Sequence, residues 1–446
     1  MKNLSIVFLF VICFFSAAAQ KKLISGPMLG YVEHREALIW IEVSKEAKAA
    51  EIKYWKSGKP EDINALKYDG KLGQPFNPLK FILVALDINT TYEYEIILDG
   101  KKVELSYPTR FTTKDLWEWR KPAPDFSFLA GSCSFVNDSI YDRPGKPYGN
   151  KVQIFESMAK ENAAMMIWLG DNTYTREVDY SSRWGMNYRY SHTRSLPQMQ
   201  TFLAKMPHYA TWDDHDYGPN NANKSFRYRE FSKSLFDAYW GNPSSGQLNQ
   251  GIYTQMRYGD CDFFLTDDRF FRADDNLPDS IAGLPNPDKE MMGKMQMDWL
   301  KNALINSEGA FKFICIGSQA LNEVTPYDAF HHYPAEYYQL LNFIKENKIK
   351  GVLFMSGDCH FSKVIRLERK DNYPLYDIVS SSLTSGTYKA SEAEKKFIVP
   401  GTLVETQNYA KISISGPAKS RQLQVEFILS DGSKAGEFKV NQKDLQ

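Results

Sequence analysis

The stretch Met166-Ile-Trp-Leu-Gly-Asp171-Asn-Thr-Tyr174 is a short apolar run that stops at a glycine and continues into an aspartate and a tyrosine. Two other apolar runs also end in side chains that can bind metals, residues 210–216 (Ala-Thr-Trp-Asp-Asp-His-Asp) and residues 353–360 (Leu-Phe-Met-Ser-Gly-Asp-Cys-His). Apolar runs of this length predict buried strands, and ligands bind at the carboxyl ends of strands in open α/β sheets. We therefore expect the three stretches to converge on one shared metal-binding site.

The composition is that of a globular chain with length for two domains. Of its 446 residues, 43% are hydrophobic and 24% are charged, so a sizeable core is expected. Basic and acidic residues are equal in number, which gives a formal net charge of zero. This balance argues against strong nucleic-acid binding and leaves a small molecule as the expected partner.

The first 19 residues have the features of a secretory signal peptide. Lys2 supplies the positive charge, residues 4–15 the apolar core, and residues 17–19 (Ala-Ala-Ala) a small-residue cleavage site. The apolar core is shorter than the roughly 20 residues that a spanning helix needs. We expect cleavage near Ala19, a periplasmic or secreted protein, and no membrane span afterwards; an uncleaved anchor is the alternative.

The remaining cysteines are too few and too scattered for a disulfide framework. They are Cys133, Cys261, Cys315 and Cys359. Cys261 and Cys315 lie in apolar strand-like runs, where cysteine behaves as a small buried hydrophobe.

Residues 20–120 are expected to form a small all-β domain. Apolar and polar residues alternate over residues 37–43, 51–55 and 92–98, which is typical of half-buried strands. Residues 86–94 resemble the leucine-turn-tyrosine signature of fibronectin type III domains, in which a corner tyrosine bonds to nearby backbone. No residue here suggests catalysis, so we interpret this domain as a packing module.

Residues 121–446 are expected to form an α/β catalytic domain, because apolar strands alternate with helix-like stretches. Strands without polar alternation indicate burial on both faces of a sheet. Strand-like residues 410–414 and 423–429 predict that the end of the chain completes one of the sheets.

Two of the strand ends carry side chains suited to a strong Lewis acid. Cys133 follows the apolar run 126–130, and a thiolate favours zinc or iron over calcium or magnesium. Asp171 could bridge two cations with its two oxygens, and the Tyr174 phenolate suits a trivalent ion. The alternatives are a buried structural cysteine and an aspartate that caps the next turn.

The other two strand ends combine carboxylates with histidine. Three aspartates surround His215, and their mutual repulsion calls for cations. His215 could donate a proton to a leaving oxygen, with Asp216 orienting its ring; a solvated acidic loop is the alternative. In an extended segment Asp358 and His360 would face the same way and Cys359 the other.

An arginine pair follows the apolar run 263–265. Either Arg269 or Arg272 could clamp a phosphate bidentately or pair with local carboxylates, and we favour Arg269 as the catalytic residue. Residues 183–190 interleave cations and aromatics, which fits a pocket wall or a surface helix equally well.

Six motifs occur in an order that resembles one known family. They are Gly131-Ser-Cys133, Gly170-Asp171-x-x-Tyr174, Trp212-Asp-Asp-His215-Asp216, Asp267-x-Arg269-x-x-Arg272, Met292-Gly-x-x-Gln296-x-x-Trp299-Leu300 and Gly357-Asp358-x-His360. Together they resemble the PhoD-like alkaline phosphatases, members of the calcineurin-like metallophosphoesterases. The resemblance covers roughly residues 20–440, since that family also begins with a small β-sandwich.

The resemblance implies a calcineurin-like fold, two packed mixed sheets flanked by helices, and hydrolysis of phosphoric monoesters or diesters. It also implies ferric iron assisted by calcium, with another divalent metal as the alternative. By this resemblance iron would be held by Cys133, Asp171, Tyr174 and His360. The second cation would be held by Asp171, Asp214 and Asp358.

The remaining roles also follow from the resemblance. Asp213 would add a ligand or support its loop, and His215 would donate a proton beside the substrate. Asp268 stands where the family usually has threonine, and an extra carboxylate there would weaken anion binding by Arg269.

The chemistry fits these residues without the resemblance. A metal lowers the pKa of bound water and so supplies hydroxide, and paired cations offset charge on phosphoryl oxygens. The sequence has no Gly-x-Ser-x-Gly elbow and no Gly-x-x-x-x-Gly-Lys loop, which argues against nucleophile-elbow esterases and P-loop NTPases. The alternatives are a surface binding protein that keeps a structural metal site, and a metallohydrolase of a non-phosphate ester such as a sulfate.

Overall fold

A computed structural model of the protein describes residues 22–446. The predicted signal peptide lies outside the described residues. The chain divides into two compact units. The first groups the described residues up to Leu116 with Tyr190–His208 and Ala238–Gly241; the second holds Trp117–Arg189, Tyr209–Asp237 and Asn242–Gln446. A sequence-based boundary at residue 120 gave no reason to group residues 190–208 with the first unit.

Residues 22–116 of the first unit form an all-β sandwich, as their alternating sequence predicts. One antiparallel sheet has the order β1 (Leu23–Val32), β2 (Ala37–Val43), β5 (Asn77–Leu83). The other contains β3 (Ala50–Lys56), β4 (Asn64–Lys67), β6 (Thr91–Leu98), β7 (Lys101–Lys102) and β8 (Arg110–Thr112). Helix α4 (Pro197–Lys205) also belongs to this unit.

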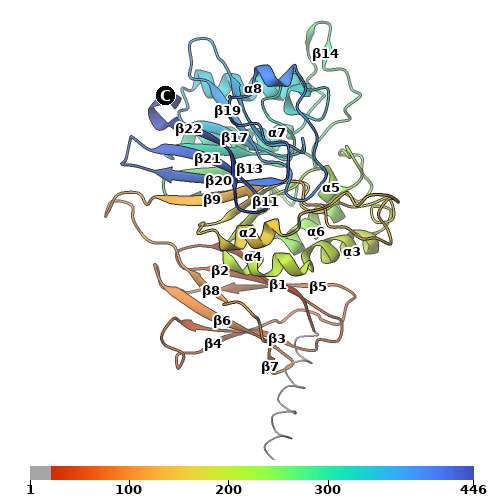
Figure 1. The fold of residues 1–446 in the computed structure, drawn as a ribbon, viewed down its shortest axis with the longest axis vertical. Helices are drawn as coiled ribbons and strands as arrows, with labels where there is room; N and C mark the ends of the chain where they lie inside the picture. Colours follow the sequence, from red (N-terminus) through yellow and green to blue (C-terminus); the bar gives the residue numbers. More distant parts are fainter. Residues whose placement is uncertain (1–21) are drawn as a thin grey trace, which may run out of the picture. The chain divides into compact units, whose positions relative to one another are not determined.

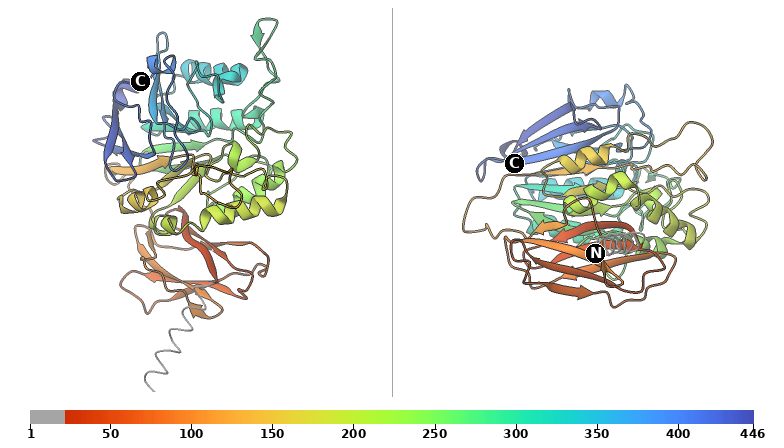
Figure 2. Two further views of the ribbon diagram at one scale, coloured as in Figure 1. Left: turned by 45° about the vertical axis from the view of Figure 1, so that its right-hand side comes forward. Right: turned by 60° about the horizontal axis from the view of Figure 1, so that its bottom comes forward.

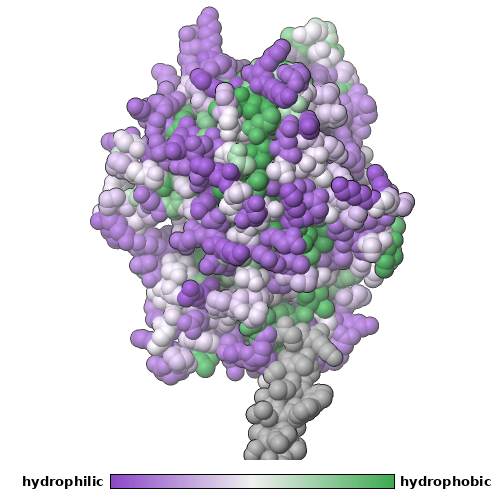
Figure 3. All heavy atoms as spheres, in the orientation of Figure 1, coloured by the Kyte–Doolittle hydropathy of each residue, from purple (hydrophilic) through white to green (hydrophobic). Residues whose placement is uncertain are grey.

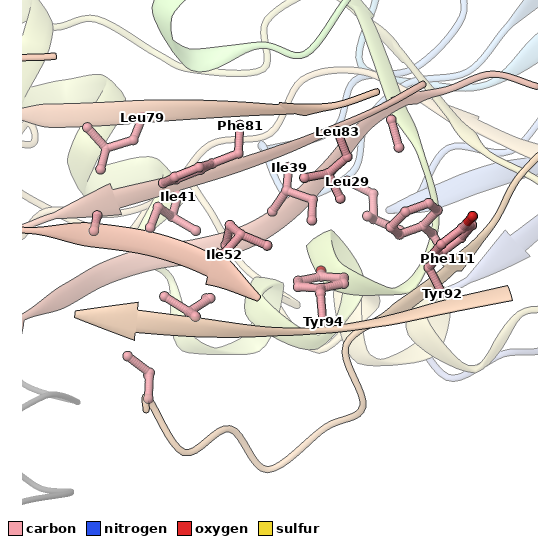
Figure 4. Packing of buried hydrophobic residues seen from close by; sticks show 14 of the residues in the cluster. Leu29, Ile39, Ile41, Ile52, Leu79, Phe81, Leu83, Tyr92, Tyr94 and Phe111 are labelled. Carbon is pink, nitrogen blue, oxygen red and sulfur yellow. The ribbon is translucent and has the colours of Figure 1, made fainter. Parts of the chain in front are cut away.

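The inward residues of the two sheets form the core of this sandwich (Figure 4). Ile39, Ile41 and Phe81 come from one sheet, and Tyr94 comes from the other. The hydroxyl of Tyr92 accepts a hydrogen bond of 2.9 Å from the backbone N–H of Asp87. This is the tyrosine corner that the leucine-turn-tyrosine stretch predicts.

The second unit contains two six-stranded mixed sheets, which confirms the predicted fold class. The first has the order β11 (His208–Thr211), β10 (Met166–Leu169), β9 (Phe126–Gly131), β20 (Asn408–Ser415), β21 (Gln422–Leu429), β22 (Lys434–Asn441). The second has the order β12 (Thr254–Tyr258), β13 (Cys261–Leu265), β16 (Phe311–Cys315), β17 (Val352–Ser356), β19 (Leu375–Val379), β18 (Lys363–Leu367).

Helices and turns connect these strands. The α-helices are α2 (Ile154–Lys160), α3 (Arg183–Arg194), α5 (Asp214–Tyr217), α6 (Arg229–Tyr239), α7 (Gly293–Asn306) and α8 (Pro334–Glu346). Short 3-10 helices span η1 (Phe330–His332), η2 (Glu394–Lys396) and η3 (Gln442–Leu445). The hairpin of β14 (Ser280–Ile281) and β15 (Leu284–Pro285) projects outward from its unit (Figures 1 and 2).

The two sheets of the second unit pack face to face through phenylalanines. Phe128 on β9 meets Phe263 on β13 and Phe313 on β16, with ring centroids 5.1 and 5.4 Å apart. Strands β16 and β17 are buried along their whole length, as their unbroken apolar sequence predicts. The C-terminal strand β20 pairs antiparallel with β9, so the end of the chain completes a sheet as expected.

This architecture brings several strand ends to one edge. β9 pairs parallel with β10 in one sheet, and β13, β16 and β17 run parallel in the other. The turns after β9, β10 and β17 carry Cys133, Asp171 and Asp358. The buried strands therefore set the positions from which the candidate ligands project.

The face of the molecule drawn in Figure 3 is mostly polar. Hydrophilic residues on this face surround scattered apolar strips. Among the described helices, none combines the length and hydropathy of a membrane span.

Candidate metal centre and substrate cavity

Two groups of potential metal ligands share one carboxylate. Ligand atoms of Cys133, Asp171 and His360 lie within 4.8 Å of one another, and so do those of Asp171, Asp214 and His215. Asp171 belongs to both groups, so its two oxygens could serve two cations. Five of the residues singled out from the sequence are thus brought together.

The first group combines a thiol, a carboxylate, an imidazole and a phenol. The Cys133 Sγ lies 3.8 Å from Asp171 Oδ2, and the Tyr174 hydroxyl lies 3.2 Å from His360 Nε2. The Ser381 hydroxyl lies 3.2 Å from the same sulfur. A set of sulfur, nitrogen and oxygen donors at one point suits a transition metal better than calcium or magnesium.

The ring of His360 is oriented by its other nitrogen. Nδ1 lies 2.8 Å from the carbonyl oxygen of Gly386, which can only accept a hydrogen bond. Nδ1 therefore carries the hydrogen, and Nε2 keeps its lone pair on the side of Tyr174. Tyr148 also approaches Nδ1, with its hydroxyl at 2.9 Å. Such outer partners are typical of histidines that bind metals.

The second group lies where helix α5 begins. The backbone N–H of His215 donates to Asp171 Oδ1 at 3.2 Å, and that of Asn221 donates to Asp214 Oδ2 at 2.7 Å. The ring of His215 stacks on Tyr174 with centroids 4.4 Å apart. Its Nδ1 has no hydrogen-bond partner in the described part of the protein. His215 can therefore act as a ligand or as the predicted proton donor.

Asp216 does not orient the ring of His215, and this expectation was wrong. Its carboxylate accepts hydrogen bonds from the backbone N–H groups of Asn172, Thr173 and Asp213, at 3.1, 2.9 and 3.2 Å. Asp216 therefore ties the loop after β10 to the start of α5, and so holds the two ligand-bearing segments together.

The backbone at four candidate ligands is left-handed. The φ angles are +57° at Cys133, +52° at Asp171, +67° at Asp358 and +60° at His360. A non-glycine residue in this region costs roughly 1–2 kcal/mol, and such strain concentrates at functional sites. Its recurrence at these corners shows that the turns are held by the surrounding fold.

Burial makes this cluster unfavourable as an uncompensated set of charges. Burial raises the pKa of Asp171 well above its usual range, and the Asp214 carboxylate raises it further. Burial followed by the charge of Asp171 does the same to the pKa of the Cys133 thiol and of the Tyr174 phenol. Burial lowers the pKa of His360 to about 4, which keeps the ring neutral near pH 7. Coordinated cations would favour the deprotonated forms, so the donor set fits metal ions.

Residues 357–360 are not extended, so the alternation expected there does not apply. The strand ends at Ser356, and the chain then turns through two left-handed residues. Asp358, Cys359 and His360 all border the same cavity, although the Cys359 thiol donates to the Phe361 carbonyl at 3.1 Å. Burial and then the charge of Asp214 raise the pKa of Asp358 to about 7.

Arg269 lies in a buried ion-pair network and does not line the cavity. Its Nε donates to Asp213 Oδ1 at 2.6 Å, and its Nη2 contacts Asp328 and Ser318. Asp213 is fully buried in this pair, and its other oxygen, Oδ2, has no hydrogen-bond partner among the described residues. Asp268 is also engaged inward, accepting 2.7 and 2.8 Å hydrogen bonds from Ser318.

Arg272 is the arginine of this pair that borders the cavity. Its Nη2 donates to Asp275 at 2.8 Å and also contacts Asp328. Its charge is thus already shared by two carboxylates, which limits what it can offer to a phosphate.

A cavity of about 1340 Å³ opens onto both ligand groups. Its wall includes Arg143 and Lys146 from the loop before α2, and Lys389 from the loop after β19. It also includes the aromatic rings of Tyr148 and Tyr388. Residues 183–190, the other possible wall, form part of α3 and do not line it.

Sequence reasoning missed several side chains that contact the ligands. Ser381 meets the Cys133 sulfur, while Tyr148 and Tyr388 contact the ring of His360. All three lie on irregular segments, where no apolar periodicity marks which side chain points inward.

Comparison with known proteins assigns most of this chain to one family. The family model for PhoD-like phosphatases matches residues 131–425, well over half of the chain. The chain belongs to the PhoD-like phosphatase family. A model described only as a domain of unknown function (DUF7800) matches residues 20–116.

Individual relatives of this PhoD-like chain are distant. Alkaline phosphatase D of Bacillus subtilis (strain 168) is 25% identical over 316 residues, covering 59% of this chain and 51% of that protein. The match thus spans about half the length of that relative. A structure of PhoD superposes with a TM-score of 0.74 at 18% identity, over 96% of this chain and 92% of that one. The purple acid phosphatase PPD1 from yellow lupin gives 0.64 at 10% identity, over 94% and 74%. Both likenesses concern the fold.

Proposed function

We propose that this chain is a metal-dependent phosphoric ester hydrolase that acts on monoesters or diesters. The observation that carries the proposal is the pair of ligand groups that share Asp171 at the floor of a solvent-reached cavity. Membership of the PhoD-like phosphatase family supports the same reaction class. A substrate small enough for the cavity, carrying one phosphoryl group, is the expected partner.

The donor types support iron at the first group together with Tyr174, and calcium at a carboxylate set in which Asp358 joins Asp171 and Asp214. Cys133, Asp171, Tyr174 and His360 would hold iron, since a thiolate favours a transition metal over calcium or magnesium and a phenolate suits a strongly Lewis-acidic trivalent ion. Asp171, Asp214 and Asp358 offer carboxylate oxygens, which suit calcium or another divalent ion. When bound, such cations lower the pKa of water and offset negative charge on phosphoryl oxygens.

The protein's own groups then position the substrate and move a proton. His215 belongs to the second group and borders the cavity, so its ring can give a hydrogen bond or a proton to the leaving oxygen. Stacking on Tyr174 restricts its ring to one orientation. Arg269 acts through Asp213 by holding the start of α5, and Asp216 holds the loop of Asp171 against it.

The direct test is turnover of p-nitrophenyl phosphate and of bis-p-nitrophenyl phosphate by purified protein. Activity that disappears with a chelator and returns with iron and calcium supports the proposal. No hydrolysis of either ester with any metal would favour a binding module, and hydrolysis of an aryl sulfate alone would favour a different ester.

We also propose that the protein is exported, to the periplasm or beyond the cell. The first 19 residues support this by their charge, apolar core and small-residue site. Cell fractionation of the full chain beside a version lacking these residues tests it, and cytoplasmic recovery of both would contradict it.

A further inference from the structure

Tyr388 presents an aromatic ring to the cavity directly beside a candidate metal ligand. Its ring lies almost parallel to that of His360, with centroids 5.0 Å apart and planes inclined by 17°. Tyr388 nevertheless remains 58% exposed and lines the cavity. One side of the ring thus meets the histidine while much of its surface stays open.

The position of this ring is held by three contacts. Its backbone N–H donates to the carbonyl oxygen of His360 at 3.2 Å. Its hydroxyl lies 3.2 Å from the hydroxyl of Tyr148, which in turn lies 2.9 Å from His360 Nδ1. The third contact is the stacking on His360. An exposed ring that is already fixed loses little conformational freedom when a second ring stacks on it.

We propose that Tyr388 is a stacking platform for an aromatic leaving group of the substrate. The inference rests on the proposed function, because the ring borders His360, where a phosphoryl group would meet the cations. The leaving group is bonded to that phosphoryl group through a single oxygen, and both His215, its proposed proton donor, and Tyr388 line the same cavity. Aryl phosphates and nucleotides carry such a ring, whereas glycerol phosphate and sugar phosphates do not.

Two non-hydrolysable analogues isolate this contact from the chemistry of bond cleavage. Phenylphosphonate and methylphosphonate share the phosphoryl group and differ in the ring. Titration calorimetry with metal-loaded protein gives the ratio of their dissociation constants. The variants are Tyr388→Ala, Tyr388→Phe and the control Tyr338→Ala, an exposed tyrosine outside the cavity. Metal content per chain checks that the His360 side of the site is intact.

Stacking predicts a specific pattern. Tyr388→Ala should reduce the preference for phenylphosphonate by about two- to tenfold, as expected for one aromatic pair. Tyr388→Phe and Tyr338→Ala should keep it. In kinetics, Tyr388→Ala should raise KM for phenyl phosphate more than for glycerol phosphate, with kcat changed far less.

Three results would overturn the platform: an unchanged ratio in Tyr388→Ala, equal weakening of both phosphonates, or no binding of either one. Failure of the proposed function is a separate outcome. If no ester is hydrolysed but the preference for phenylphosphonate is present and falls in Tyr388→Ala, the activity is rejected and Tyr388 remains a stacking surface for an aromatic ligand.

Discussion

Replacing Arg269 separates two roles that a phosphatase arginine can have. In the structure its guanidinium is fully buried and pairs with Asp213 and Asp328. If this is its role, Arg269→Met removes the cation from a buried network. The loss should then be seen first in stability.

The magnitude follows from the geometry. At an effective dielectric constant of about 20, two unit charges about 4 Å apart attract by roughly 4 kcal/mol. Removing one partner of a buried pair typically costs about 3–5 kcal/mol, because the other charge stays buried. We therefore expect Arg269→Met to lower the free energy of unfolding by about 3–5 kcal/mol. Adding Asp213→Asn should restore part of it, since that carboxylate then no longer needs a partner.

Urea unfolding followed by tryptophan fluorescence measures the change, with Trp212 close to the affected pair. The control is Arg366→Met, which breaks an exposed pair with Glu368 and should cost less than about 1 kcal/mol. Turnover is measured without urea, so that each variant is folded during the assay. Full stability of Arg269→Met together with a collapse of kcat/KM would refute the ion-pair argument and return Arg269 to phosphate binding.

Three further outcomes are expected. Cys133→Ser and Tyr174→Phe should each lower the iron content and weaken the visible charge-transfer absorption. The control is Cys315→Ser, which replaces a buried cysteine on β16 and should change neither quantity. Unaltered colour and iron content in both site variants would reject Cys133 and Tyr174 as ligands. Burial raises the pKa of Glu42 from 4.5 to about 7, so the folded state keeps a proton that the unfolded state releases. The free energy of unfolding should therefore fall by roughly 3 kcal/mol as the pH rises through that interval. Glu42→Gln should lack this fall. The prediction fails if urea unfolding at pH 5 and pH 7.5 gives the wild type and the variant the same change in free energy of unfolding. Gly170→Ala would place a methyl group 2.7 Å from the Asp213 Cβ at a φ of +87°, and should lower both thermal stability and metal content; a variant matching the wild type would show that this approach is not tight.

The sequence was sufficient to predict the scaffold and the meeting of its strand ends. Unbroken apolar runs identified β10 and β17 as buried strands, and the polar residues after them were expected to share one edge. The structure brings Asp171, Asp214 and His360 to that edge. The prediction needed only the buried strands and the residues that follow them, and both can be recognised in a local stretch of sequence.

What the sequence could not show depends on contacts between distant segments. Asp216 looked like a partner of the adjacent His215, yet its hydrogen bonds reach the loop after β10. Arg269 and Arg272 follow the same strand, and only the packed structure shows that Arg272 borders the cavity. Tyr388 lies on an irregular loop, so no periodicity of the sequence could predict its contact with His360.

Stability and function make opposite demands on the left-handed turns at four candidate ligands, Cys133, Asp171, Asp358 and His360. Glycine would relax each corner, but it would carry no donor atom. A laboratory selection for heat resistance alone should therefore replace these side chains early, and the selected variants would be more stable but inactive. Thermostable variants of this protein are better sought by selecting for turnover after heating.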